Sequence, residues 1–200
     1  MTDTQVRVKV VEARQLEGSN VHPVCKLTLF GETKTTRVKK ATGNPIWNEV
    51  FYYSNNISPA EIVDEMINFE VYNSKKLRSD ALIGSFSCDC GLVYAMSKHT
   101  VLNKWLLLSD SEDQSGVRGY LKICMAILGP GDEAPSFKAK PGDAEHEDIE
   151  SNLLMPAGMT LAPANFILKA YSAEDLPRMD SAMMEGVKKF LVLESKNLKN

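Results

Sequence analysis

Seven basic residues fall into two short stretches of the sequence, where their charges could attract one anionic partner. They are Lys34, Arg37, Lys39 and Lys40 in the first stretch and Lys75, Lys76 and Arg78 in the second. Each basic side chain beside an anionic bilayer contributes about 1 kcal/mol of attraction, which falls off within a Debye length. The pattern favours weak, salt-sensitive binding of an anionic surface; a solvated strand face and a solvated loop are the alternative.

The sequence offers no comparable case for catalysis. It contains no nucleophile elbow, phosphate-binding loop or histidine pair that could hold a metal, and His22, His99 and His146 stand in three unlike contexts. We therefore expect neither enzyme activity nor a cofactor. The net charge of -3 argues against general nucleic-acid binding.

The cysteines and the hydropathy pattern indicate the compartment. Cys25, Cys88, Cys90 and Cys124 lack the density and spacing of a disulfide scaffold, which favours free thiols in the cytosol. The chain shows neither a signal-peptide pattern at its start nor an apolar run of about 18 residues. We expect a cytoplasmic chain that meets a membrane only from its surface.

Eight short segments with apolar or alternating patterns predict an all-β fold. They are residues 6–11, 24–30, 34–40, 50–53, 67–72, 82–88, 101–108 and 119–128. Regular spacing between turn signals indicates an eight-stranded antiparallel sandwich, with short helices at 59–66 and 91–98. Alternation along 34–40 would place Lys34 and Lys40 on one face and Arg37 and Lys39 on the other. The expected core comprises Trp47, Phe51, Phe69, Phe86 and Trp105.

The most specific motif is the stretch from residue 43 to 51, which reads Gly-Asn-Pro-Ile-Trp-Asn-Glu-Val-Phe. Proline forces Asn44 into an extended or turn conformation, and the large ring of Trp47 requires burial. This stretch resembles the N-P-x-W-N-E-x-F pattern of C2 domains. The resemblance implies a C2-type β-sandwich over residues 1–129.

The composition changes after residue 129. Residues 130–150 are rich in Gly, Pro, Ala, Asp and Glu, which is typical of a solvated acidic linker, and residues 151–158 form a short apolar island in it. We assign residues 130–164 to this linker. Residues 168–176 then repeat the pattern of residues 8–16, with Lys169, Ala173 and Leu176 in register with Lys9, Ala13 and Leu16. We interpret residues 165–200 as the start of a second, truncated C2 domain.

Longer stretches narrow the resemblance to the ferlins, large tail-anchored proteins with tandem C2 domains. The matching stretches are residues 6–16, 104–113, 119–122, 129–133, 150–158 and 173–177. The chain is similar to a ferlin's second C2 domain, the ferlin-specific segment after it and the start of the third C2 domain. The resemblance implies a fragment or short isoform of a protein of vesicle–membrane fusion and membrane repair.

The resemblance also identifies the positions that would hold calcium, because Ca²⁺ needs six to eight oxygen ligands, several of them anionic. These degenerate positions are Glu17, His22, Asn73, Lys75 and Ala81, with Asp80 one residue out of register. At most one conventional anionic ligand survives, and Lys75 adds a cation. We expect no metal site; the alternative is a weak site built from Glu17, Asn73 and Asp80.

Together these observations predict a non-catalytic, membrane-associating C2 module. It would bind phosphatidylserine or phosphoinositides through its basic residues without calcium. The alternative is a protein-interaction module that docks a partner or a sister C2 domain without lipid. Membrane binding requires Lys75, Lys76 and Arg78 on one side of the domain, whereas protein docking has no such requirement.

Overall fold

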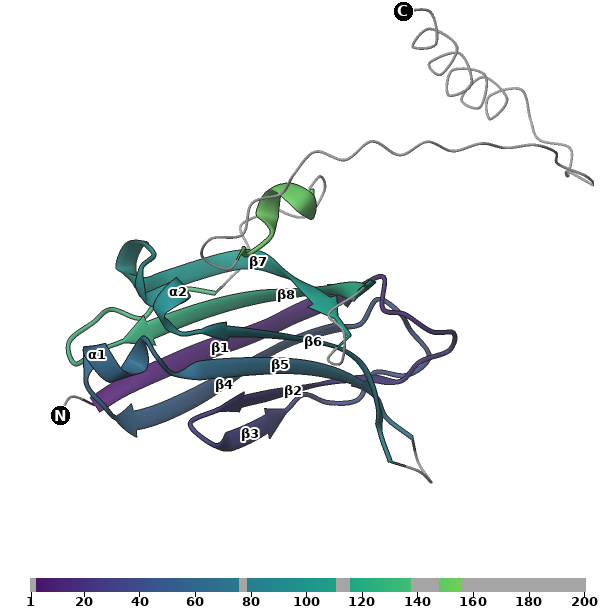
Figure 1. The fold of residues 1–200 in the computed structure, drawn as a ribbon, viewed down its shortest axis with the longest axis horizontal. Coiled ribbons are helices and arrows are strands. Elements are labelled where there is room, and N and C mark those ends of the chain that lie inside the picture. Colours follow the sequence, from purple (N-terminus) through teal and green to yellow (C-terminus); the bar gives the residue numbers. More distant parts are fainter. Residues whose placement is uncertain (1–2, 76–78, 111–115, 138–147, 156–200) are drawn as a thin grey trace, which may run out of the picture. The chain divides into compact units, whose positions relative to one another are not determined.

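The computed structural model describes residues 3–75, 79–110, 116–137 and 148–155, and shows one antiparallel ladder of eight strands (Figure 1). The strands are β1 (Asp3–Arg14), β2 (Pro23–Leu29), β3 (Glu32–Thr35), β4 (Ile46–Asn56), β5 (Met66–Asn73), β6 (Ala81–Asp89), β7 (Thr100–Ser109) and β8 (Val117–Leu128). Their order is β3-β2-β5-β6-β7-β8-β1-β4. The predicted all-β, eight-stranded antiparallel fold is confirmed.

The ladder bends between β6 and β7, which share only the pair Ser85–Ser109. The bend gives two facing layers, β3-β2-β5-β6 and β7-β8-β1-β4 (Figure 1). Gly84 permits it, because a Cβ atom there would lie 2.8 Å from Cβ of Arg118 on β8. Alternation directs Val6 and Val8 of β1 and Ile123 of β8 into the core between the layers.

Short helices lie outside the sandwich. They are α1 (Pro59–Ile62), α2 (Gly91–Tyr94), and the 3-10 helices η1 (Ser97–His99) and η2 (Glu150–Asn152). Ser58 and Glu61 form a capping box that starts α1. None of the helices in the described part of the chain is long and apolar enough to cross a membrane.

Two expectations about the elements were wrong. The strand expected at residues 34–40 ends at Thr35, so alternation does not assign Arg37, Lys39 and Lys40 to strand faces. Trp105 is fully buried, but it lies outside the core cluster that includes its neighbours Leu106 and Leu108. Its ring instead contacts the cationic groups of Arg14 and Lys122, at 5.0 and 5.5 Å from the ring centroid.

The described parts of the acidic segment pack against the sandwich. The ammonium group of Lys9 donates a hydrogen bond to the carbonyl of Phe137 (2.9 Å), and the amide of Leu154 donates to the carbonyl of Trp105 (2.8 Å). Leu153 forms a parallel bridge with Trp105, and Leu154 is only 5% exposed. Residues 153–154 thus occupy the edge of β7 from which β6 has diverged.

This packing differs from the solvated linker that the composition predicts. The short apolar island Leu153-Leu154 explains the difference, since burial of Leu154 favours an ordered contact despite the polar residues around it. The module expected at residues 165–200 lies outside the described residues.

The contact made by Leu154 is testable by truncation. Leu154→Ala should lower the free energy of unfolding by about 2 kcal/mol, because it removes a buried side chain from the core cluster. Leu102→Ala is a matched control on β7, since Leu102 is 47% exposed and the change there should stay within about 0.5 kcal/mol. Urea unfolding of the 200-residue chain measures both; equal stability of Leu154→Ala and the wild type would refute the packing.

Candidate functional site

Three connections meet at one end of the sandwich, which we call the loop end. Loop 1 (residues 15–22) joins β1 to β2, loop 2 (residues 36–45) joins β3 to β4, and loop 3 (residues 74–80) joins β5 to β6. The end of β7 and the start of β8 border them (Figure 1). Most of the charged positions singled out in the sequence lie on these loops.

The Asn-Pro-x-Trp motif fixes loop 2 to the sandwich. The indole N–H of Trp47 donates to the carbonyl of Arg37 (2.8 Å), which spans the whole loop. The carbonyl of Pro45 accepts the amide of Ala13 (2.9 Å), and Oδ1 of Asn44 accepts the amide of Gln15 (2.9 Å). The motif therefore ties loop 2 both to its own base and to the end of β1.

Asn48 and Glu49 complete the motif. Asn48 has a φ of 54°, a left-handed conformation that asparagine tolerates better than most residues. Oε1 of Glu49 accepts the amide of Arg37 (3.1 Å) and lies 4.0 Å from its guanidinium. Side chains of the motif thus hold the basic loop without a ligand.

His22, at a degenerate calcium position, links all three loops. Its Nδ1 accepts the amide of Ala41 (3.1 Å) in loop 2, and its carbonyl accepts the amide of Ser74 (2.9 Å) in loop 3. Its own amide donates to Oδ1 of Asn73 (2.8 Å) at the end of β5. Because Nδ1 accepts a hydrogen bond, this arrangement requires the tautomer with its proton on Nε2.

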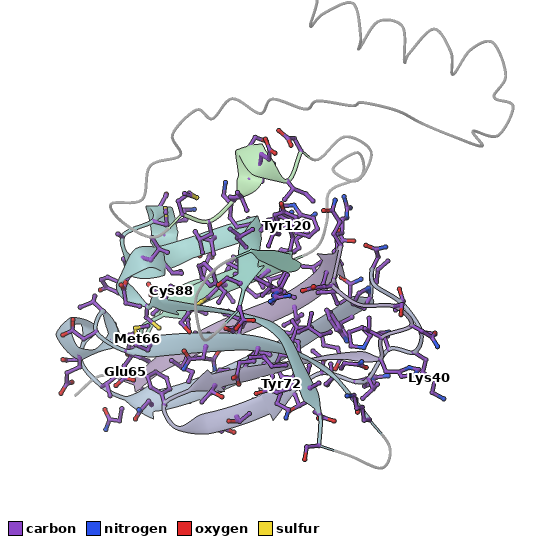
Figure 2. All side chains as sticks on the ribbon, turned by 45° about the vertical axis from the view of Figure 1, so that its right-hand side comes forward. Lys40, Glu65, Met66, Tyr72, Cys88 and Tyr120 are labelled. Carbon is purple, nitrogen blue, oxygen red and sulfur yellow. The ribbon has the colours of Figure 1, made fainter. Side chains whose placement is uncertain are left out.

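The links through His22 bring basic residues of two loops to the same end. Lys40 precedes Ala41 and Lys75 follows Ser74, and both lysines are exposed. Figure 2 shows Lys40 pointing outward at this end, opposite Glu65 and Met66. Arg37 is also exposed here (88% of its side chain), and Lys39 is half-buried.

The remaining three predicted lipid-binding residues are Lys34, Lys76 and Arg78. Lys76 and Arg78 lie outside the described residues. Lys34 lies on β3, away from loop 2, and its ammonium group bonds the carbonyl of Tyr52 (2.6 Å) and lies 3.2 Å from Glu32. The structure therefore separates Lys34 from the exposed basic residues of the loop end.

Three of the degenerate calcium positions line one pocket. Glu17, Asn73 and Ala81 surround a volume of about 410 Å³, together with Asp110 from the end of β7 and Arg118 from β8. Asp80 is not among the lining residues; it lies 3.7 Å from the ammonium of Lys26 and accepts the amide of Lys75 (3.3 Å). The proposed weak-site residues are thus not gathered around one point.

Arg118 forms ion pairs with both carboxylates of this pocket. Its Nη1 pairs with Glu17, and its Nη2 donates to Oδ2 of Asp110 (2.9 Å). Hydrogen bonding and charge from Glu17, followed by Asp110, raise the pKa of Arg118 above its usual value. The sequence reasoning missed Arg118, because nothing in the sequence indicates that it pairs with Glu17, which is 101 residues away in the chain.

The described residues hold no cluster of metal ligands, and the thiols among them are buried. No cluster of three or more His, Cys, Asp or Glu side chains in this part of the chain could hold a metal ion. The four cysteines are buried free thiols. Burial, and to a lesser degree nearby acidic groups, raises the pKa of Cys88 and of Cys90 to about 12, so both stay protonated near neutral pH.

Comparison with known families agrees with the fold. The C2 domain family model matches residues 4–108, and the FerI (NUC094) domain model matches residues 109–159. Human myoferlin is 48% identical over 187 residues, or 93% of this chain, and Xenopus tropicalis myoferlin is 45% identical over 98% of it. The chain is a C2-domain protein of the ferlin family. The predicted family is confirmed.

The chain spans only 9% of the length of human myoferlin and 10% of that of Xenopus tropicalis myoferlin. Among solved structures, a C2 domain of plant extended synaptotagmin 1 superposes with a TM-score of 0.52 at 24% identity, covering 64% of this chain and 97% of that one. A pair of C2 domains from extended synaptotagmin 2 gives a TM-score of 0.54 at 17% identity, covering 64% and 39%. These two likenesses establish the fold alone.

The boundary between the two family matches falls inside the ferlin C2 sandwich. The C2 match ends at Leu108, whereas β8 lies within the FerI match and sits between β7 and β1 in the sheet. The FerI-matched residues therefore supply a central strand, Arg118, and the contact of Leu154 with β7.

The hydrogen bond from Trp47 makes loop 2 sensitive to a single substitution. Trp47→Phe should speed tryptic cleavage after Arg37, Lys39 and Lys40 about fivefold, because loss of about 1 kcal/mol raises the opened population by that factor. Trp105→Phe is the matched control, since the indole N–H of Trp105 has no hydrogen-bond partner in the described structure. Limited trypsinolysis with mass spectrometry measures both; equal acceleration in the two variants would argue against this role of Trp47.

Proposed function

We propose that this ferlin C2 domain binds anionic membrane surfaces through its loop end without calcium. The partner would be a phosphatidylserine- or phosphoinositide-containing bilayer on the cytoplasmic side. One observation carries the proposal. The exposed residues Arg37, Lys40 and Lys75 lie at the same end of the molecule, on loops that are held by hydrogen bonds within the domain.

The charges at the loop end support attraction of an anionic surface. Glu17 shares the guanidinium of Arg118 with Asp110, and Asp80 lies beside Lys26, so cations of the domain itself pair with these carboxylates. Lys40 and Lys75 have no such partner among the ion pairs of the described residues. At about 1 kcal/mol for each basic residue, the expected binding is weak and salt-sensitive.

Loop 2 adds an apolar residue between the basic ones. Val38 is 44% exposed and lies between Arg37 and Lys39. An apolar side chain flanked by cations suits the boundary between headgroups and acyl chains. Insertion of Val38 would add a contribution that salt does not screen.

The same contacts support the proposal of calcium independence. Glu17, Asn73 and Asp80, the residues of the weak-site alternative, direct oxygens to Arg118, to the amide of His22 and to Lys26, respectively. Calcium would have to displace these donors and still find several anionic ligands. For the parent ferlin, the family resemblance suggests vesicle–membrane fusion and membrane repair as the process.

We also propose that residues 3–155 form one folded unit, beyond the boundary at residue 129 expected from the sequence. The hydrogen bond from Lys9 to the carbonyl of Phe137 and the contact of Leu154 with β7 support this extension. Residues 165–200 would then begin the next C2 domain.

A protein-interaction module is the second candidate. The outer face of β4, which ends the ladder, exposes Ile46 (57%), Val50 (37%) and Tyr52 (51%). An exposed apolar row on an edge strand suits a docked protein. This surface lies on the strand after loop 2, so membrane and protein binding are separable by mutation.

Vesicle co-sedimentation tests the membrane proposal. The double variant Lys40→Gln/Lys75→Gln should bind phosphatidylserine–phosphoinositide vesicles about 30-fold more weakly than the wild type at low ionic strength, equally in calcium and in chelator. The control Lys98→Gln/Lys104→Gln changes net charge identically on η1 and β7 and should bind like the wild type.

Three results would contradict the membrane proposal. Equal losses in the two double variants would mean that only net charge matters. Calcium-dependent binding would mean that the carboxylates at the loop end accept a metal after all. Absence of vesicle binding under every condition would favour the protein-interaction candidate.

A further inference from the structure

Arg118 lies where separate segments bring two carboxylates together. Glu17 comes from loop 1 and Asp110 follows the end of β7, yet both pair with the same guanidinium on β8. Asn73 and Ala81, two degenerate calcium positions from loop 3's flanking strands, line the same pocket. The cationic group therefore lies in the pocket where the family resemblance expects metal ligands.

The backbone around Arg118 is built to hold it there. Its carbonyl accepts the amide of Glu17 (3.0 Å), so loop 1 is joined to β8 by its backbone as well as its side chain. Gly84 leaves room for Cβ of Arg118 at a distance where any other residue would clash. Gly119 has a φ of 138°, and a Cβ atom there would lie 2.9 Å from the side chain of Leu16. Two glycines thus permit the close approach of loop 1, β6 and β8.

A guanidinium is well suited to replace a metal between two carboxylates. It keeps its charge at all physiological pH values and presents several N–H donors in a planar fork. Here Nη1 donates a hydrogen bond to Glu17 and Nη2 donates one to Asp110, so one cation reduces the repulsion between two anions. Unlike Ca²⁺, it is covalently attached and does not dissociate when the free calcium concentration falls.

We infer that Arg118 is a built-in cation that replaces calcium at the loop end. Its guanidinium joins loop 1 to the end of β7 permanently, as a bound metal ion would. This inference deepens the proposed function, since it names the residue responsible for calcium independence. The absence of the aspartates expected at the calcium positions would by itself explain calcium independence. The present inference goes further, because it predicts that removal of the positive charge of Arg118 produces a response to calcium.

Thermal unfolding of the full 200-residue chain without lipid tests the inference. The Tm of the wild type should be the same in excess calcium and in chelator. Arg118→Gln should lower the Tm in chelator by about 2–4 °C, and excess calcium should recover part of that loss by binding at Glu17 and Asp110 in place of the guanidinium. Arg118→Lys retains the charge and should show a smaller loss with no calcium response.

Two further variants keep the result specific. Arg14→Gln removes an arginine that pairs with Glu12 outside the pocket, so its Tm should not respond to calcium. Glu17→Gln combined with Arg118→Gln should abolish the calcium recovery. A wild-type Tm that rises with calcium, or an Arg118→Gln variant as insensitive to calcium as Arg14→Gln, would overturn the inference.

The measurement separates this inference from the membrane proposal. Vesicle binding plays no part in the Tm measurement. An Arg118→Gln variant whose Tm does not respond to calcium would therefore not contradict the proposal that the basic loops bind membranes. Conversely, a chain that does not bind vesicles can still show the predicted calcium response in Arg118→Gln.

Discussion

Carboxylates that meet at a loop end repel one another unless a cation lies between them, and the organisation of this domain depends on how that constraint is met. Here the cation is the guanidinium of Arg118, between Glu17 and Asp110. Protein groups also accept hydrogen bonds from one amide of each loop: the carbonyl of Arg118 from Glu17, Nδ1 of His22 from Ala41 and the carbonyl of His22 from Ser74. The loop end is thus assembled from the protein's own donors and acceptors, which leaves Lys40 and Lys75 free to face outward.

Two parts of the chain that are distant in sequence give this loop end its support. The Asn-Pro-x-Trp motif secures loop 2 through the bond from Trp47 to Arg37. The FerI-matched residues supply β8, which carries Arg118 into the pocket and lies between β7 and β1. Leu153 and Leu154, which follow β8, then pair with the backbone of Trp105 at the edge of β7. A C2 sandwich cut at the end of its family match would lose both its central strand and its internal cation.

The sequence predicted the features that depend on local pattern. Alternation located most of the strands, and the motif around Trp47 identified the fold through its resemblance to C2 domains. Two of its residues, Trp47 and Glu49, bond backbone groups of Arg37 in loop 2. Pattern could not place Arg118 against Glu17, since that pairing depends on the order of strands in the sheet and on Gly84. The sequence pattern also placed Trp105 between the layers, because periodicity indicates that a residue is buried but not which face of β7 is covered. The contact of Leu154 with β7 was not predicted, because the segment around it was interpreted from its composition alone.

Hydrogen exchange at the loop amides tests most directly whether the loop end is complete without calcium. The amides of Glu17, Ala41 and Ser74 each donate to a protein acceptor, the carbonyl of Arg118, Nδ1 of His22 and the carbonyl of His22, respectively. The account predicts that all three exchange slowly, with the same protection in chelator and in excess calcium. Amides that exchange freely in chelator and become protected only when calcium is added would contradict it.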